Sequence, residues 1–263
     1  MNYQTIIVEN KEYITTVTYN RPEKLNAINL QMRRELEEVF TQLDEDEKTR
    51  VIIVTGKGRG FSVGRDTTEL FSPEEVERRK DQDLIRMARV GTPLFFGNIG
   101  KPVIAAVNGL AVGGGFATAL CADIRIAAES ARFMSQWSRL GGTPEGGVTY
   151  LLPRIVGIAK ACELILTSKM IDAKEAREIG LINQVVPDDK LAQTAYEMAR
   201  SIAKLSPLAI RASKQGLYLG MGANLVSQLQ FETLSLHYLR QTEDFQEASK
   251  AFIEKRDGIF KER

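Results

Sequence analysis

Short apolar runs separated by polar residues dominate the first half of the chain. Residues 51–55 (VIIVT) and 102–107 (PVIAAV) are almost entirely apolar, which predicts two strands buried on both faces. Residues 5–8 and 14–19 predict two paired strands, joined by the polar residues 9–12. An apolar stripe at helical spacing predicts an amphipathic helix. The stripe consists of Met32, Leu36, Val39, Phe40 and Leu43.

The second half of the chain is mainly helical in pattern. Ser206-Pro207 and Thr143-Pro144 each place a capping residue before a proline, which predicts the start of a helix. Short strand and helix units followed by a helical tail predict an α/β fold. We expect the α/β core to span residues 1–200 and a helical C-terminal extension to span residues 201–263.

Composition sets limits on the partners of this chain. It has 35 basic and 34 acidic residues and a formal net charge of +1. A neutral total does not favour nucleic acid or an anionic membrane as a partner. No apolar run approaches the roughly 20 residues that a membrane span needs. The N-terminal residues show no targeting signal, so a cytoplasmic protein is expected.

The chain contains two cysteines, Cys121 and Cys162. Their surroundings are apolar or helical, and their spacing is not that of metal ligands. We expect both to be free, buried thiols, and we expect no metal site.

Two glycine-bearing segments follow predicted buried strands. They are residues 56–66 (GKGRGFSVGRD) and 108–116 (NGLAVGGGF), and the second opens a helix. Glycine lets a backbone approach a ligand closely, and the first N–H groups of a helix are unpaired. Neither segment has the pattern of a P-loop or of a dinucleotide-binding turn. Tight turns with close helix packing are the simpler interpretation of either segment alone.

Taken together, the glycine segments and their flanks resemble the enoyl-CoA hydratase/isomerase (crotonase) family over nearly the whole chain. The resemblance rests on seven ordered stretches. They are residues 20–27 (NRPEKLNA), 60–66 (GFSVGRD), 101–109 (KPVIAAVNG), 113–115 (GGG), 151–157 (LLPRIVG), 173–186 (AKEAREIGLINQVV) and 252–256 (FIEKR).

The resemblance implies a crotonase (ClpP-like) fold, in which repeated ββα units form a spiral, with a C-terminal region that mediates trimerisation and covers CoA. It also implies an oxyanion hole made by the backbone N–H groups of Val63 and Gly114. Two fixed donors would stabilise the negative charge that a thioester oxygen gains when the acyl group enolises. Because these donors belong to the main chain, their side chains are free to vary.

Coenzyme A is expected as part of the substrate, with no separate cofactor. By resemblance, Lys24, Leu25 and Ala27 would hold its adenine nucleotide. Phe252 and Lys255 would reach the CoA of a neighbouring subunit in a homotrimer or in a hexamer built from two trimers. Gly64, Arg65 and Asp66 flank the oxyanion loop, where the two charged residues would hold the loop or contact CoA. The simpler interpretation of Lys24 and Lys255 is a solvated charge.

The pattern departs from that of the hydratases at two positions. Hydratases of this family resemble one another in two glutamates that hold the attacking water, and these positions are Ala117 and Trp137 here. Hydration by two carboxylates is therefore not expected of this chain.

One carboxylate follows in Thr143-Pro144-Glu145-Gly146. The segment resembles that of peroxisomal-type Δ3,Δ2-enoyl-CoA isomerases, whose glutamate moves a proton between the α- and γ-carbons of the acyl chain. An alternative interpretation is structural, because an acidic residue in the first turn of a helix stabilises that helix by about 0.3–1 kcal/mol.

Trp137 adds a second resemblance, to 4-chlorobenzoyl-CoA dehalogenase, which pairs a tryptophan here with an aspartate nucleophile at the position of Glu145. The histidine of that enzyme aligns with Val90, which argues against dehalogenation. Trp137 is expected either to form a wall beside a ring or bulky acyl chain or to be a large core residue.

The leading hypothesis is an enoyl-CoA isomerase with Glu145 as proton shuttle. Two alternatives stay open: a hydratase, hydrolase or dehalogenase-like enzyme acting on a cyclic or bulky acyl-CoA, and a non-catalytic relative that binds RNA or a protein. The neutral charge and intact glycine segments count against the last of these.

Overall fold

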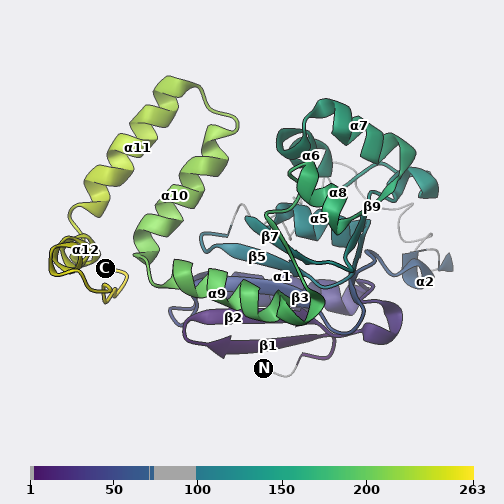
Figure 1. Ribbon diagram of the computed structural model, residues 1–263, viewed down its shortest axis with the longest axis horizontal. Coiled ribbons are helices and arrows are strands. Elements are labelled where there is room, and N and C mark those ends of the chain that lie inside the picture. The colour runs from purple at the N-terminus through teal and green to yellow at the C-terminus, as the bar shows by residue number, and fades with distance from the viewer. Residues whose placement is uncertain (1–2, 71, 74–98) are drawn as a thin grey trace.

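Two sheets form the centre of the computed structural model, which describes residues 3–70, 72–73 and 99–263 (Figure 1). The larger sheet has six strands in the order β1-β2-β3-β5-β7-β10. Its strands are β1 (Ile6–Lys11), β2 (Ile14–Tyr19), β3 (Val51–Gly56), β5 (Val103–Val107), β7 (Ile124–Ala128) and β10 (Gln184–Val186). The smaller sheet has the order β4-β6-β8-β9. Its strands are β4 (Gly60–Ser62), β6 (Leu110–Val112), β8 (Arg132–Met134) and β9 (Met170–Asp172).

The larger sheet is parallel except for its first pair, and both of its faces are covered. In β3, Ile52 and Val54 point into one apolar core, while Val51 and Ile53 point into the other. This alternation explains why the strand sequence is apolar without interruption, as predicted. The two cores are closed by helices α1 (Leu30–Glu45) and α9 (Leu191–Ala203), respectively. All five residues of the predicted stripe are buried on α1.

The first hairpin is longer than predicted. β1 continues through the polar residues that were expected to form the connection, and Lys11 pairs with Ile14. Glu12 and Tyr13 form the turn with φ values of 51° and 66°, the left-handed conformations that a tight two-residue hairpin requires. Residues 9–11 are exposed at the edge of the sheet, so their polarity is compatible with a strand.

Shorter helices connect the strands along the chain. They are α2 (Thr67–Leu70), α5 (Gly114–Cys121), α6 (Val148–Val156), α7 (Ile158–Thr167) and α8 (Ala173–Glu178), with 3-10 turns η1 (Pro22–Lys24), η3 (Trp137–Leu140) and η4 (Asp188–Lys190). The prediction that Thr143-Pro144 starts a helix is wrong, since α6 begins only at Val148. The glycines before it, Gly146 and Gly147, adopt φ values of 69° and 80°, which an α-helix excludes.

The helical extension consists of α10 (Pro207–Gly220), α11 (Leu225–Leu239) and α12 (Glu243–Glu254), which project away from the sheets (Figure 1). Ser206 caps α10 as predicted, its side chain accepting from the N–H of Ala209. The α/β architecture with a helical extension is thus confirmed.

No helix in the described part of the chain is both long and apolar enough to span a membrane. Of the two thiols, Cys121 is buried as predicted, but Cys162 is exposed.

A buried ion pair joins α10 to the core. The ammonium of Lys214 donates to Asp123 at 2.8 Å and to the carbonyl of Lys101 at 2.8 Å. The hydroxyl of Tyr218 donates to the other carboxylate oxygen of Asp123, also at 2.8 Å. Burial lowers the pKa of Lys214, and the charge of Asp123 opposes that effect. These bonds fix the first of the projecting helices to the residues that precede β5 and β7.

Replacing Lys214 by Met should therefore destabilise the protein markedly, because Asp123 would lose its charged partner in a buried site. We expect a loss of about 3 kcal/mol in unfolding free energy, measured by denaturant titration. Arg33→Met is the matched control, since Arg33 pairs with Glu37 on the exposed face of α1. The control substitution should lower the unfolding free energy by less than about 0.5 kcal/mol. Equal effects of the two variants would contradict an anchoring role for Lys214.

Candidate active site

A cavity of about 240 Å³ opens between the two glycine segments and the loop before α6. It contains three of the residues singled out in the sequence for catalysis and one proposed wall residue, Trp137. The described residues that line it are Val63, Arg65, Thr67, Gly113, Gly114, Gln136, Trp137, Leu140, Gly142 and Glu145.

Close contact between two backbones requires the glycines of this site. A Cβ atom on Gly115 would lie 2.0 Å from the carbonyl oxygen of Ser62, and one on Gly64 would lie 2.6 Å from the nitrogen of Gly114. Both distances are far below van der Waals contact, so no other residue fits without moving a backbone. The simpler interpretation of the glycines, close packing, is correct, and the same packing brings Val63 and Gly114 to one wall of the cavity.

The two candidate donors differ in their hydrogen bonds. Gly114 is the first residue of α5, and its N–H has no acceptor among the described residues, as expected at a helix N-terminus. The N–H of Val63 donates to the carbonyl oxygen of Leu25 at 3.2 Å. A substrate oxygen would therefore either share the N–H of Val63 with the carbonyl of Leu25 or displace that carbonyl from it.

The segment around residues 20–27 is held by buried polar side chains against residues 57–66, which include the candidate oxyanion loop at residues 60–66. Asn26 is fully buried, and its amide donates to the carbonyls of Gly60 at 2.7 Å and Lys57 at 3.0 Å. Leu25 and Asn26 adopt left-handed φ values of 51° and 55°. Such a value is strained for leucine and persists only where surrounding bonds enforce it, whereas asparagine adopts it more readily. Residues 20–27, which carry part of the family resemblance, thus position the loop that bears Val63.

Asp66 performs the loop-holding role that was one of its two expected functions. Its carboxylate accepts from Arg21 at 3.0 Å and from the N–H of Thr68 at 3.1 Å. Burial alone would raise the pKa of Asp66, but these hydrogen bonds and the charge of Arg21 outweigh burial and hold the pKa below its usual value. Its neighbour Arg65 is exposed and lines the cavity.

Glu145 lies on an irregular loop and not in a helix, so the helix-stabilising interpretation of this residue is wrong. The residue is exposed and lines the cavity. Trp137 is half-buried at the start of η3 and lines the same cavity. Ala117, one of the two positions where hydratases carry glutamate, is buried in α5.

The residues expected to bind CoA fall into two groups. Lys24 is exposed, Leu25 is half-buried and Ala27 is buried, all on the segment that packs against the oxyanion loop. Phe252 and Lys255 lie at the end of α12, on the opposite side of the molecule from α2 and α5 (Figure 1). A single copy of the chain does not bring them to the cavity. Val90 lies outside the described residues.

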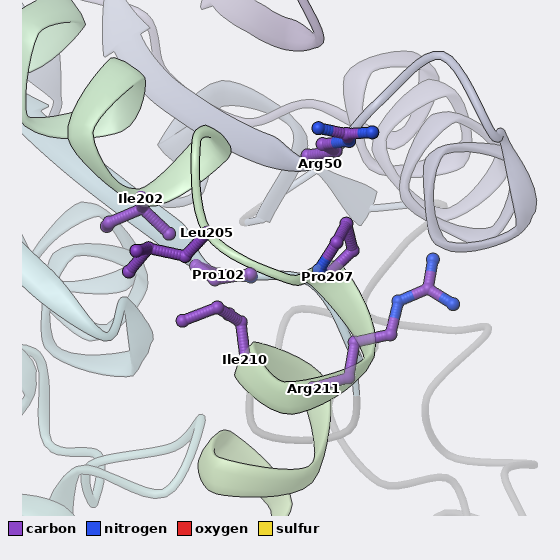
Figure 2. Close-up of a pocket in the computed structure, with 7 residues that line it drawn as sticks. All are labelled: Arg50, Pro102, Ile202, Leu205, Pro207, Ile210 and Arg211. Atoms are coloured by element: carbon purple, nitrogen blue, oxygen red, sulfur yellow. The ribbon is translucent and has the colours of Figure 1, made fainter. Parts of the chain in front are cut away.

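A second cavity is too small to be a substrate site. It has a volume of about 10 Å³, at the lower limit for one water molecule. Figure 2 shows its lining, where the side chains of Arg50 and Arg211 flank Pro207. Both arginines pair with Glu262, at 3.7 and 3.4 Å, so this region fixes the C-terminal tail to the core.

Sequence reasoning missed several lining residues, among them Thr67, Gln136 and Leu140. Thr67 and Gln136 directly adjoin predicted site residues in the sequence, and this adjacency is the one sequence feature that could have indicated them. The described residues contain no group of three or more His, Cys, Asp or Glu side chains that could hold a metal.

Comparison with known proteins agrees with this architecture. The enoyl-CoA hydratase/isomerase family profile matches residues 9–263. A short-chain-enoyl-CoA hydratase from Clostridium acetobutylicum is 39% identical over 259 residues, covering 97% of both chains. The 1,2-epoxyphenylacetyl-CoA isomerase of Escherichia coli is 37% identical over 256 residues, covering 94% of both. The crystal structure of an enoyl-CoA hydratase from Bacillus anthracis superposes with a TM-score of 0.87 at 33% identity, covering 99% of this chain and 100% of the other.

The chain belongs to the enoyl-CoA hydratase/isomerase family and has the crotonase fold. It is therefore an acyl-CoA-processing enzyme of the crotonase superfamily, as the sequence predicted.

The role of Asp66 in holding the oxyanion loop predicts a pH-dependent effect of Asp66→Asn. Because the pKa of Asp66 is lowered in the folded state, its carboxylate stabilises the protein at neutral pH, and this contribution is lost as the pH falls through the lowered pKa. At pH 7 the variant should lose about 1.5 kcal/mol of unfolding free energy in urea titrations. The difference in unfolding free energy between wild type and variant should be smaller near pH 3. Asp189→Asn, at a 74% exposed side chain, is the control and should show little change at either pH. A difference in unfolding free energy that does not change with pH would contradict the ionic role of Asp66.

Proposed function

We propose that this chain is an enoyl-CoA isomerase that moves the double bond of a 3-enoyl-CoA into conjugation with its thioester. One observation carries the proposal: among the described residues that line the cavity, Glu145 is the only acid, and it lies there with Val63 and Gly114. Moving a proton between two carbons of one substrate needs a single carboxylate that accepts the proton and returns it.

The reaction would proceed in two proton transfers. The carboxylate of Glu145 takes the α-proton, and the electron pair of the broken C–H bond delocalises over the diene onto the thioester oxygen. The protonated Glu145 then gives the same proton to the γ-carbon, so that the double bond ends between the α- and β-carbons. No atom is gained or lost, and the carboxylate is regenerated.

The negative charge on the thioester oxygen would be stabilised by the N–H groups of Gly114 and Val63. Gly114 offers, at the start of α5, an N–H with no acceptor among the described residues, whereas Val63 would exchange its 3.2 Å bond to Leu25 for a bond to a charged oxygen. Bonds to charged acceptors are about twice as strong as neutral ones, which favours the exchange. Loss of one donor in comparable sites costs roughly 2.7–4 kcal/mol in activation free energy.

A second candidate function is hydration or hydrolysis of a bulky acyl-CoA, with Glu145 activating a water molecule. The hydratase name of the Clostridium acetobutylicum relative favours it. Against it stand Ala117 and Trp137, which leave this chain without a carboxylate at either hydratase position. A dehalogenase-like reaction has less support, because Glu145 is one methylene longer than the aspartate nucleophile of that enzyme.

The cavity is proposed to accept a ring or a bulky acyl chain in addition to a straight one. Trp137 and Leu140 give the cavity apolar surface on which a ring can pack. The name of the Escherichia coli relative, an isomerase of an epoxyphenylacetyl thioester, supports both a ring and an isomerisation. Lys24, Leu25 and Ala27 are proposed to hold the nucleotide of the attached CoA.

The C-terminal extension, residues 201–263, is proposed to assemble a homotrimer or a hexamer and to cover the CoA of a neighbouring copy. Its helices expose large apolar side chains in a single copy, including Leu217, Leu225 and Phe252, which are 73–86% exposed. Exposed apolar surface of this extent is typical of an interface between subunits. Phe252 and Lys255, which lie far from their own cavity, would then serve a neighbour's site.

Glu145→Gln should abolish isomerisation while leaving binding intact, because glutamine keeps the shape of the side chain but cannot accept the proton. We expect kcat to fall at least about 1,000-fold. Hex-3-enoyl-CoA in labelled water, followed by mass spectrometry, separates the outcomes: isomerisation adds no solvent oxygen, whereas hydration and hydrolysis do. Calorimetric binding of hexanoyl-CoA should be unchanged in the variant. Retained isomerisation by Glu145→Gln, or solvent oxygen in the wild-type product, would reject the proposal.

Phe252→Ala should raise KM for the acyl-CoA several-fold and leave kcat unchanged, because Phe252 would contact CoA and not the reacting carbons. Steady-state kinetics give both constants, and sedimentation should give three or six times the 29.3 kDa chain mass for variant and wild type. Ile259→Ala, at another exposed residue of the tail, is the control. A monomeric wild type with normal activity would contradict this role for the extension.

A further inference from the structure

A buried thiol contacts the loop that carries Glu145. The Sγ–H of Cys121, the last residue of α5, donates to the carbonyl oxygen of Gly146 at 3.1 Å. Cys121 is 1% exposed. The bond therefore joins the end of α5 to the residue that directly follows the proposed base.

The loop from residue 142 to residue 147 has few other ties to the rest of the protein. The N–H of Gly142 donates to the carbonyl of Trp137 at 3.0 Å, and the carbonyl of Glu145 accepts from Val148 at 3.4 Å. Neither of these bonds leaves the segment between η3 and α6. The carbonyl of Gly147 accepts from the N–H groups of Tyr150 and Leu151 in α6. Among the hydrogen bonds of the described residues, the thiol of Cys121 makes the only one that connects this loop to an element other than its neighbours in sequence, η3 and α6.

The helix that provides this tie is also the helix that provides the oxyanion donor. α5 spans Gly114–Cys121, with the N–H of Gly114 at its first residue and the thiol at its last. An α-helix rises 1.5 Å per residue, so the two ends are separated by about 10 Å of rigid backbone. The position of the loop relative to the donor is consequently fixed through one short element.

The chemistry of the thiol suits a permanent donor. Burial raises the pKa of Cys121 to about 12, and the positive charge of Arg125 opposes the rise only in part. The group therefore keeps its proton throughout the physiological range. A thiol is a weak donor, but a bond inside an apolar core has no competing water.

We propose that Cys121 is a positioning residue, which holds the Glu145 loop at proton-transfer distance from a thioester whose oxygen is bound at Gly114. This inference rests on the proposed function of Glu145. Cys121 does not touch the substrate. Its contribution is to the geometry of proton transfer and should appear in kcat and not in substrate binding.

The test compares Cys121→Ala, which removes the donor, with Cys121→Ser, which keeps a donor of similar size. Isomerisation of hex-3-enoyl-CoA by Cys121→Ala should have kcat reduced about ten-fold, because a small displacement of a catalytic group has a large kinetic cost. KM and the calorimetric affinity for hexanoyl-CoA should stay within about two-fold of wild type, since the donors and CoA contacts are unchanged. Cys121→Ser should recover kcat to within about three-fold of wild type, because its hydroxyl can donate to the same carbonyl.

Cys162→Ala is the matched control, at the exposed cysteine on α7, and should have wild-type kinetics. Melting temperatures separate a positioning effect from simple destabilisation. If Cys121→Ala is poorly folded, Cys121→Val replaces it, as an apolar side chain of similar volume without a donor. The proposal is overturned if the variant without a donor retains wild-type kcat, or if Cys121→Ser is as impaired as that variant. Failure of the proposed function is a separate result, since either the wild type would not isomerise hex-3-enoyl-CoA or Glu145→Gln would keep that activity.

Discussion

The site depends on one steric constraint, the contact between the backbones of two glycine loops. Gly64 lies against the nitrogen of Gly114, and Gly115 lies against the carbonyl of Ser62, at distances that leave no room for a Cβ atom. This contact joins the end of β4 to the start of α5 and brings Val63 and Gly114 to the same wall of the cavity. The buried side chain of Asn26 and the ion pair between Arg21 and Asp66 hold the first of these loops from its other side. The proposed oxyanion site is thus formed by packing, and its two main-chain N–H groups need no side chain of their own.

The parts of the fold that the sequence predicted well are those where one physical effect dominates. The strand at 51–55 is buried on both faces, so its apolar run has a single explanation. The stripe on α1 likewise reflects burial of one helix face. The end of β1 was missed because an edge strand tolerates polar residues, and the helix predicted at Thr143 was wrong because two glycines in left-handed conformations follow it. Local capping preference was outweighed there by the backbone conformation of the next residues.

The candidate site was only partly accessible to sequence reasoning. Val63, Gly114 and Glu145 came from the family resemblance, and the structure brings them to one cavity. The bond between Val63 and Leu25 could not be predicted, since it depends on a strained turn at residues 25–26. Thr67, Gln136 and Leu140 have no linear pattern that distinguishes them from surface residues. Phe252 and Lys255 cannot be related to the cavity from a single copy, because α12 lies on the far side of the molecule (Figure 1).

The separation between the donors and the base has an evolutionary consequence. The donors are main-chain groups, so no single codon change removes an N–H unless it introduces proline. The carboxylate, by contrast, is one side chain on a loop outside the glycine contact. In this chain Ala117 and Trp137 occupy positions where hydratases carry glutamate, while an acid stands at Glu145. With Glu145 as the proposed base, chains that share this scaffold can differ in their reaction through the number and position of their acidic side chains, while the proposed main-chain donors stay the same.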